Sequence, residues 1–383
     1  MPDRPPRPPG ELVWLHVTGA QRRGPLLRLG QRLAGQRPGL TLLYTAAPDV
    51  PPPPRLRGAA LWQPLPAEGV GEAQRFMRHW APDCCLWSGG APRAALLGAA
   101  SKAGVPLFLV DADERDLDGG LTWLLTLRGD AFGRFDAALA RDDGAARRLR
   151  RLGIPSDRIS VIGLLQEGSG PLPCDEAAFD SFSGLLATRP VWLAAMTQPA
   201  EVAPVLQAHR ATLRLAHRLL LILVPDKLAD ADAAAADISA AGLLAVRRSA
   251  GELPDDATQV YLADTRGEMG LWYRLSPVTF MASSLEAGHG GRDPYEPAAL
   301  GSAVICGPNM DHHIDACSRL LAGGAARIAG DAASLSDALS HLIAPDRAAA
   351  MAQAGWQIVS AGAEVTDRIT DLVLDTLDLG QTA

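Results

Sequence analysis

The sequence contains few cysteines and no long apolar segment, and these absences exclude several classes of protein. Its 383 residues include only 5 cysteines, with no CxxC spacing, so we expect neither a disulfide scaffold nor a structural zinc site. No stretch of about 18 uncharged apolar residues occurs, so we expect no membrane-spanning helix. Residues 1–10 (MPDRPPRPPG) lack the apolar stretch of a signal peptide, which favours a cytoplasmic protein. We expect no metal ion and no cofactor.

The chain is acidic, with a formal net charge of −7, but its charges are unevenly placed. Residues 1–80 hold 11 arginines against 5 acidic residues, and the remainder is acidic. Five of these arginines are close together in the sequence, mostly on one predicted helix: Arg22, Arg23, Arg28, Arg32 and Arg37. This basic face fits contact with an anionic membrane or acceptor, and a solvated arginine-rich helix explains it equally well. Nucleic acid is not an expected partner, because aromatic and basic residues are not interleaved.

Short, continuously apolar runs alternate with helical patterns along the whole chain, which is typical of parallel strands covered on both faces. After Pro190 the same alternation begins again. We therefore predict an α/β protein with two Rossmann-like domains facing each other across a cleft, and a ligand at the carboxyl ends of the strands. The predicted strands are residues 11–17, 40–45, 84–87, 105–110, 136–140 and 159–163, then 191–195, 219–224, 243–247, 259–263, 278–281 and 303–306.

The predicted domain boundary lies at the proline that precedes the second set of strands. The first domain is residues 1–188 and the second is residues 189–345. Residues 346–383 have a helical pattern to the end of the chain, and we expect this helical segment to pack back on the first domain.

Two glycine-containing loops in residues 261–308 are suited to binding an anion. Residues 264–270 (DTRGEMG) link a predicted strand to a helix, and small residues there leave backbone N–H groups accessible to a nucleotide. Residues 288–294 (GHGGRDP) form a second loop, in which His289 is a candidate ligand contact. Glu296 then opens a short helix, where a carboxylate can bind ribose hydroxyls. Tight turns required only by backbone geometry are the alternative for both loops.

From residue 190 to about residue 308, the chain resembles the Kdo (3-deoxy-D-manno-octulosonic acid) transferases of lipopolysaccharide biosynthesis. The motifs that carry the resemblance are VWLAA, LLLILVP, ADTRGEMGLWYRLSPVTF and a GG..P.EPAALG run, in the family's order. The resemblance is fainter in the first domain, at residues 14–16 and 105–112. It implies a glycosyltransferase B fold and an enzyme at the inner face of the cytoplasmic membrane. It further implies a donor, CMP-Kdo or a related CMP-sugar, on residues 189–345, and a lipid A-like or other glycoconjugate acceptor on residues 1–188.

The same resemblance implies a set of donor-binding residues. Residues 266–269 would lie against the nucleotide, Glu296 would hold its ribose, and the glycine loop would reach the phosphate and the sugar. The donor-binding residues predicted in this way are Lys227, Arg266, Gly267, Glu268, Met269, His289, Gly290, Gly291, Arg292, Asp293 and Glu296.

The chain departs from the family's motifs at charged positions. The family's SVGE, whose Glu is the proposed general base, reads TGAQ at residues 18–21, and neither Ala20 nor Gln21 can accept a proton at neutral pH. The family's PRHPER reads PDKLAD at residues 225–230, so an Arg expected to neutralise phosphate is lost and Lys227 is its candidate substitute. The family's GGHNPLEP reads GGRDPYEP at residues 290–297, where Arg292 restores a positive charge.

Three residues remain candidates for the catalytic role. His16 ends the first strand, Asp111 follows a strand of the first domain, and Gln21 stands beside the missing base; a structural histidine and a solvated loop are the alternatives for the first two. The leading hypothesis is a Kdo-transferase-like glycosyltransferase. The others are a catalytically degenerate homologue that binds a nucleotide or glycolipid, and a nucleotide-sugar epimerase or hydrolase of the same fold.

Overall fold

The structure, a computed structural model, describes residues 5–53, 56, 58–117, 131–166, 172–187 and 189–382. The chain divides into two compact units. The first comprises Met1–Gly168 and Ala361–Ala383, and the second comprises Ser169–Ser360.

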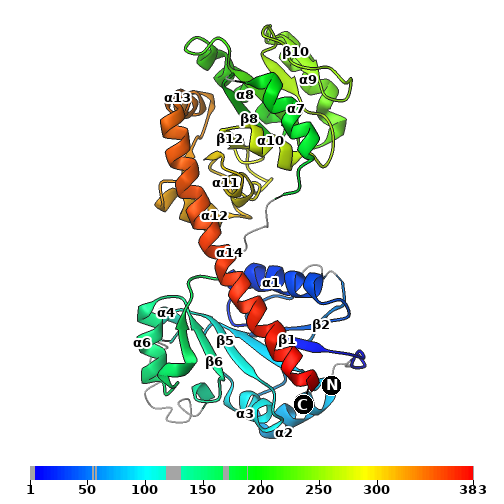
Figure 1. The fold of residues 1–383 in the computed structure, drawn as a ribbon, viewed down its shortest axis with the longest axis vertical. Helices are drawn as coiled ribbons and strands as arrows, with labels where there is room; N and C mark the ends of the chain where they lie inside the picture. Colours follow the sequence, from blue (N-terminus) through cyan, green and yellow to red (C-terminus); the bar gives the residue numbers. More distant parts are fainter. Residues whose placement is uncertain are drawn as a thin grey trace. The chain divides into compact units, whose positions relative to one another are not determined.

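In the first unit, seven described strands form one parallel sheet in the order β3-β2-β1-β4-β5-β6-β7 (Figure 1). The chain moves from β1 to β3 on one side and then crosses to β4, so the topological switch point lies between β1 and β4. The strands are β1 (Leu12–Val17), β2 (Thr41–Ala46), β3 (Ala60–Trp62), β4 (Cys84–Ser88), β5 (Leu107–Ala112), β6 (Ala137–Ala140) and β7 (Ile159–Val161). The helices are η1 (Ala20–Arg22), α1 (Arg23–Gln36), α2 (Val70–Trp80), α3 (Ala94–Lys102), α4 (Glu114–Leu117), α6 (Asp143–Arg151), η3 (Ser156–Arg158) and the end of α14 (Pro345–Thr382).

The surroundings of strand β1 explain why nearly all of its residues are apolar. All of its residues are buried. Trp14 packs into a cluster with residues of α2, α3 and α6, whereas Val13 and Leu15 pack into a second cluster with residues of α1 and α14. Helices therefore cover both faces of the sheet, and alternate side chains of each central strand enter opposite cores.

The second unit repeats this plan. Its seven described strands form a parallel sheet in the order β10-β11-β9-β8-β12-β13-β14, with the switch point between β8 and β12 (Figure 1). The strands are β8 (Val191–Thr197), β9 (Leu220–Pro225), β10 (Ala245–Arg247), β11 (Val260–Leu262), β12 (Val278–Met281), β13 (Ala303–Cys306) and β14 (Ala326–Ile328). The helices are α7 (Glu176–Leu186), α8 (Pro199–Leu213), η4 (Leu228–Asp230), α9 (Ala231–Ala240), α10 (Met269–Leu275), α11 (Tyr295–Ala299), α12 (Ile314–Ala322), α13 (Ala332–Leu342) and the start of α14.

The predicted architecture of two Rossmann-like domains, each with a parallel sheet, is confirmed. The twelve predicted strands all form, within a few residues of their predicted bounds. The sequence analysis missed β3 and β14, which are edge strands of three residues each. Such short strands leave too little periodicity to recognise. No helix among the described residues is long and apolar enough to cross a membrane.

The two units divide the chain before α7, whereas the sequence analysis placed the domain boundary after it. Thr188, at the predicted boundary, lies outside the described residues. Helix α7 groups with the second unit because Phe182 packs edge-on against Tyr261 and Trp272, with ring centroids 5.6 and 5.4 Å away. At the other end of the chain, the residues of α14 from Ala361 onward group with the first unit.

The cysteines lie mostly in the cores of the two units. Cys84, Cys85, Cys306 and Cys317 are buried, whereas Cys174 is half-buried. Burial raises the pKa of Cys84 and of Cys85 well above the ordinary thiol value. These two thiols therefore stay protonated and unreactive.

Candidate functional site

A buried carboxylate organises the carboxyl edge of the second sheet at its switch point. Glu201, in the first turn of α8, has no exposed surface. Its Oε2 accepts from the N–H groups of Gln198 at 3.0 Å and Ser283 at 2.6 Å. Its Oε1 accepts from the N–H groups of Ser284 and Leu285, both at 2.8 Å. One side chain thus ties the loop after β8 to the loop after β12.

Two residues in these loops adopt left-handed backbone conformations that non-glycine residues rarely occupy. Met196 and Ser283 both have φ of +60°. The Ser283 hydroxyl donates to the carbonyl of Met196 at 2.8 Å and accepts from the side-chain amide of Gln198 at 2.9 Å. Backbone strain of this kind is held by surrounding contacts and occurs most often at functional sites.

A cavity of about 440 Å³ opens beside these loops, at the carboxyl ends of β8, β9 and β11. It brings together Lys227 and residues 266–269, which the sequence analysis assigned to donor binding from separate motifs. Asp226 and Trp272 also line it. The predicted Arg292 does not line this cavity, but it forms an ion pair with Asp226.

Glu268 is oriented in this cavity by a cation that the sequence analysis missed. Arg248 donates to Glu268 Oε1 at 2.7 Å, and Thr265 donates to its Oε2. The Arg248 guanidinium lies 5.1 Å from the ring centroid of Phe182 and 5.8 Å from that of Trp272. Burial raises the pKa of Glu268, but these hydrogen bonds and the charge of Arg248 outweigh it and hold that pKa below its ordinary value. Glu268 is therefore an anion at neutral pH, suited to accept hydrogen bonds.

A second unpredicted network fixes the start of the same loop. Asp264, directly after β11, accepts from the guanidinium of Arg247 at 2.7 Å. It also accepts from the N–H of Ser249 at 2.9 Å and from the hydroxyl of Ser249 at 2.7 Å. The loop after β10 therefore holds the loop after β11 at both Asp264 and Glu268.

The glycine loop requires its glycines for two reasons. Gly290 and Gly291 have φ of +74° and +75°, a conformation that glycine adopts without strain. A Cβ at Gly290 would stand 2.4 Å from Nδ1 of His312, and one at Gly291 would stand 2.4 Å from the sulfur of Met310. Close packing on the loop after β13 therefore excludes larger residues. The predicted His289 is exposed and precedes these two glycines.

The predicted carboxylates after the glycine loop have distinct surroundings. Asp293 is buried, and its Oδ1 accepts from the N–H of Tyr295 at 3.0 Å, so it supports the turn into α11. Glu296 is only half-buried and accepts from the hydroxyl of Tyr273 at 3.4 Å. Burial, with the charge of Glu296, raises the pKa of Tyr273 well above its ordinary value, so the hydroxyl stays protonated and can donate. Glu296 is the more accessible of the two carboxylates to a ligand.

In the first unit, the contacts of His16 favour a structural role. Its side chain is 1% exposed and lies 3.9 Å, between ring centroids, from Trp87. The Thr45 hydroxyl accepts from the Trp14 indole at 2.8 Å and forms a second hydrogen bond with Nδ1 of His16, also at 2.8 Å. Burial, together with the charge of Arg93, lowers the pKa of His16 to about 3. The imidazole is therefore neutral at physiological pH, and Thr45 already binds one of its ring nitrogens.

The other two catalytic candidates lie at the carboxyl edge of the first sheet. Asp111, the last residue but one of β5, has φ of +52°, is 5% exposed, and pairs with Nε of Arg22 at 3.0 Å. Burial raises the pKa of Asp111, and the charges of Arg22 and Arg141 oppose this effect. Its Oδ1 is buried without a hydrogen-bond partner among the described residues. Gln21 is exposed in η1, and its amide cannot accept a proton.

The basic face predicted around α1 is largely neutralised within its own unit. Several of its arginines form ion pairs with acidic side chains of the described residues. The pairs are Arg22 with Asp111, Arg32 with Asp367, and Arg37 with both Glu11 and Asp378. This arrangement leaves less free positive charge on α1 than its sequence indicated.

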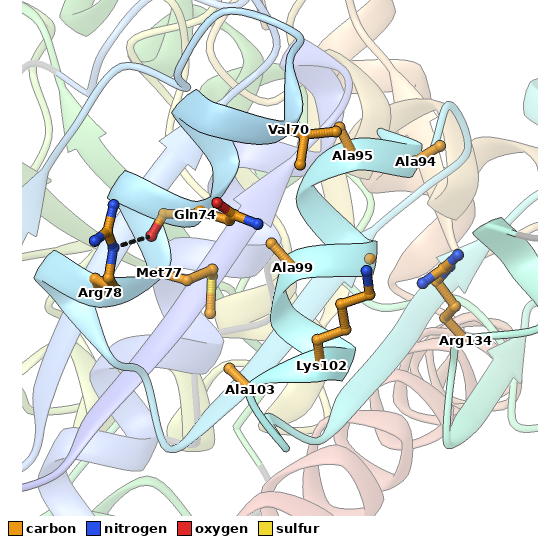
Figure 2. A pocket seen from close by; sticks show the side chains of 11 residues that line it. Val70, Gln74, Met77, Arg78, Ala94, Ala95, Ala99, Lys102, Ala103 and Arg134 are labelled. Carbon is orange, nitrogen blue, oxygen red and sulfur yellow. Dashed lines mark hydrogen bonds between the residues drawn. The ribbon is translucent and has the colours of Figure 1, made fainter.

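A cationic groove of about 500 Å³ lies instead between α2 and α3. Figure 2 shows its apolar lining, which includes Met77 and the alanines of α3, and the cations Arg78, Lys102 and Arg134. Gly98 makes room for the last of these, because a Cβ at Gly98 would stand 3.0 Å from Nη1 of Arg134. Among the described residues, those that line this groove include no acidic side chain. The sequence analysis did not predict it, because its residues come from two helices and a later loop.

Comparison with known proteins settles the family. A family model described as 3-deoxy-D-manno-octulosonic-acid transferase (kdotransferase) matches residues 2–167. The 3-deoxy-D-manno-octulosonic acid transferase of Bordetella pertussis is 33% identical over 393 residues, covering 98% of this chain and 89% of that protein. The chain belongs to the Kdo transferase family. The Haemophilus influenzae enzyme of the same name is 29% identical over 242 residues, covering 62% of this chain and 56% of that protein.

Solved structures are also similar to this Kdo transferase family member. The C-terminal CMP-Kdo binding domain of WaaA from Acinetobacter baumannii matches with a TM-score of 0.40 and 27% identity, over 53% of this chain and 99% of that one. A UDP-GlcNAc 2-epimerase from Neisseria meningitidis matches with a TM-score of 0.43 and 14% identity, over 96% of this chain and 99% of that one. The family resemblance, the glycosyltransferase class and the glycosyltransferase B fold with its two Rossmann-like units are confirmed.

Proposed function

We propose that the protein transfers Kdo, or a related sugar, from a CMP-linked donor to a lipid A-like or other glycoconjugate acceptor. The observation that carries this proposal is the cavity that joins Lys227 to residues 266–269 at the carboxyl edge of the second sheet. Ligands of open α/β sheets bind at that edge. Membership of the Kdo transferase family supports the reaction class.

The proposed donor site uses carboxylates for the nucleoside and cations for the phosphate. Glu268, held by Arg248, accepts hydrogen bonds from the nucleotide beside Gly267 and Met269. Glu296 accepts from the ribose hydroxyls. Lys227, with Arg266 on the neighbouring loop, contributes positive charge at the cavity. These roles fit the ionised state of Glu268 and the partial exposure of Glu296.

In the proposed reaction, an acceptor hydroxyl oxygen attacks the anomeric carbon of the donor sugar. The bond between that carbon and the phosphate oxygen breaks, and CMP leaves with the bonding electron pair. The site must therefore stabilise charge on the leaving phosphate, and a base must take the hydroxyl proton. Cationic side chains supply the first requirement.

For the second requirement we propose Asp111, in place of the carboxylate that the family has near residue 21. Asp111 is the ionisable candidate, and its Oδ1 has no hydrogen-bond partner within the part of the chain that the structure describes. Its pairing with Arg22 means that the acceptor must displace this contact before proton transfer. We expect Asp111→Asn to lower kcat at least about a hundredfold, the usual contribution of a general base, while leaving the Kd for CMP unchanged. An unaltered kcat would exclude Asp111 from this role.

A degenerate, non-catalytic homologue is the second candidate function, favoured by the burial of both His16 and Asp111. It predicts nucleotide binding without transfer. Sugar transfer from CMP-Kdo to a lipid A precursor by the purified protein alone would exclude this candidate.

Membrane contact, which an acceptor of this kind requires, is proposed for the groove between α2 and α3 rather than for α1. Its cations Arg78, Lys102 and Arg134 surround an apolar floor, an arrangement that suits an anionic headgroup. Vesicles with and without anionic lipid test this proposal by co-sedimentation. Equal binding to both would contradict it.

Calorimetric titration with CMP, CMP-Kdo, UDP-sugars and GDP-sugars tests the donor. We expect the cytidine nucleotides to bind and Glu296→Ala to weaken that binding by about 1–3 kcal/mol, the range for loss of a charged hydrogen-bond partner. A folded protein that binds none of these nucleotides would refute the proposed function.

A further inference from the structure

Two loops at the carboxyl edge of the second sheet are joined by an ion pair to which no role has been assigned so far. Arg292, at the end of the glycine loop, donates from Nη2 to Oδ1 of Asp226, the residue after β9. The Asp226 side chain is 8% exposed and that of Arg292 is 41% exposed. The backbone of Asp226 is also fixed, because its N–H donates to the carbonyl of Thr197 at 3.0 Å. Asp226 and Lys227 both line the cavity described above.

The guanidinium of Arg292 has hydrogen-bonding capacity that this pair does not use. Its Nε is buried and has no hydrogen-bond partner among the described residues. A buried N–H without a partner is costly, and an acceptor atom on a bound ligand would satisfy it.

Both members of the pair are departures from the motifs of the Kdo transferases. Asp226 and Lys227 stand where PRHPER has arginine and histidine, and Arg292 stands where GGHNPLEP has histidine. The two departures contact each other, so the cation at position 292 and the carboxylate at position 226 act as a pair.

We propose that Arg292 is the residue that neutralises the phosphate of the donor, and that Asp226 positions its guanidinium to do so. This inference rests on the proposed function and identifies the cation that contacts the phosphate and the residue that positions it. With Nη2 on Asp226, Nε and Nη1 remain as charged donors to phosphate oxygens, and because they point to opposite sides of the guanidinium, each takes a separate acceptor. Asp226 without Arg292 would repel the phosphate, which accounts for their occurring together.

Titration with CMP and with cytidine isolates the phosphate contact as the ratio of two dissociation constants. In the wild-type protein we expect CMP to bind at least about tenfold more tightly than cytidine. Arg292→Asp places two carboxylates side by side and should abolish this advantage while changing the Kd for cytidine less than about twofold. Adding Asp226→Arg reverses the ion pair and should regain most of the advantage. Arg292→Gln is the milder replacement if Arg292→Asp does not fold.

Arg218→Asp is the matched control, because Arg218 forms an exposed ion pair with Asp256 near the amino end of β9. Its ratio of dissociation constants should equal that of the wild type. A wild-type ratio in both Arg292 variants, or no recovery in the reversed pair, would overturn the proposal while leaving the donor site intact. Equal loss of CMP and cytidine binding in folded Arg292→Gln would also overturn it. Wild-type protein that binds neither compound would refute the proposed function and this inference together.

Discussion

Replacing Glu201 by glutamine changes one oxygen of a fully buried carboxylate into an amide group and alters almost nothing in shape. Each carboxylate oxygen accepts two backbone N–H groups, at distances between 2.6 and 3.0 Å. In Glu201→Gln, an NH₂ group must face two of these donors whichever way the amide is turned. Two buried N–H groups then lose their acceptor.

Each buried N–H group that loses its acceptor destabilises the folded state by about 1–3 kcal/mol. We therefore expect Glu201→Gln to lower the free energy of unfolding of the second unit by about 2–6 kcal/mol. Urea titration followed by tryptophan fluorescence measures this loss. Amide hydrogen exchange should locate it, with faster exchange at residues 283–285 than in the wild-type protein.

Glu286→Gln is the control, because it makes the same chemical change at an exposed carboxylate in the same loop. We expect it to alter the free energy of unfolding by less than about 0.5 kcal/mol. If Glu201→Gln behaves like this control, and residues 283–285 exchange at wild-type rates, then the carboxylate does not organise the switch point.

Two further predictions concern acid stability and close packing. Burial lowers the pKa of His16 to about 3 and that of His209 to about 4, whereas the unfolded chain takes up these protons near pH 6.5. Their contribution to the free energy of unfolding is therefore complete above pH 6.5 and decreases as the pH falls toward 4, by up to about 1.4 kcal/mol per pH unit for each histidine. The urea midpoint of His209→Gln should therefore decrease less steeply with falling pH than that of the wild type. Equal slopes in the two proteins would contradict this assignment. Gly270→Ala should destabilise the second unit by about 1–3 kcal/mol in thermal melts, because its Cβ would stand 2.0 Å from the carbonyl oxygen of Pro173. Gly184→Ala, in α7 with no atom near the added Cβ, should be neutral or stabilising by up to about 1 kcal/mol, and equal losses in both variants would contradict the packing argument.

The sequence predicts most of this fold because the central strands are buried on both faces. A strand such as β1, apolar at nearly every position, is readily recognised. Strands β3 and β14 have three residues each, which is too few to show a recognisable pattern. Small residues at fixed positions likewise marked the two glycine-containing loops, whereas the role predicted for Glu268 came from the resemblance to the Kdo transferases. Local patterns therefore predict most of the fold and mark the loops at which we propose that the donor binds.

Contacts between distant segments could not be predicted from one sequence. Arg248 lies 20 residues from Glu268, and nothing in its local pattern indicates which carboxylate it joins. Glu201 carried a weak signal, because a glutamate three residues after Gln198 is a capping-box pattern. That pattern does not reveal the N–H groups that approach from the loop after β12. The contacts of His16 likewise depend on Thr45 and the sheet register, which only the folded chain supplies.

The uneven burial of the five thiols has a practical consequence for measuring nucleotide binding. A maleimide dye applied to the folded protein should react with Cys174, since the other four cysteines are buried. Cys174 adjoins Pro173, whose carbonyl packs on the first turn of α10 directly after Glu268. A native, singly labelled fluorescent reporter thus stands beside the cavity, and occupancy can be followed without engineering any other position.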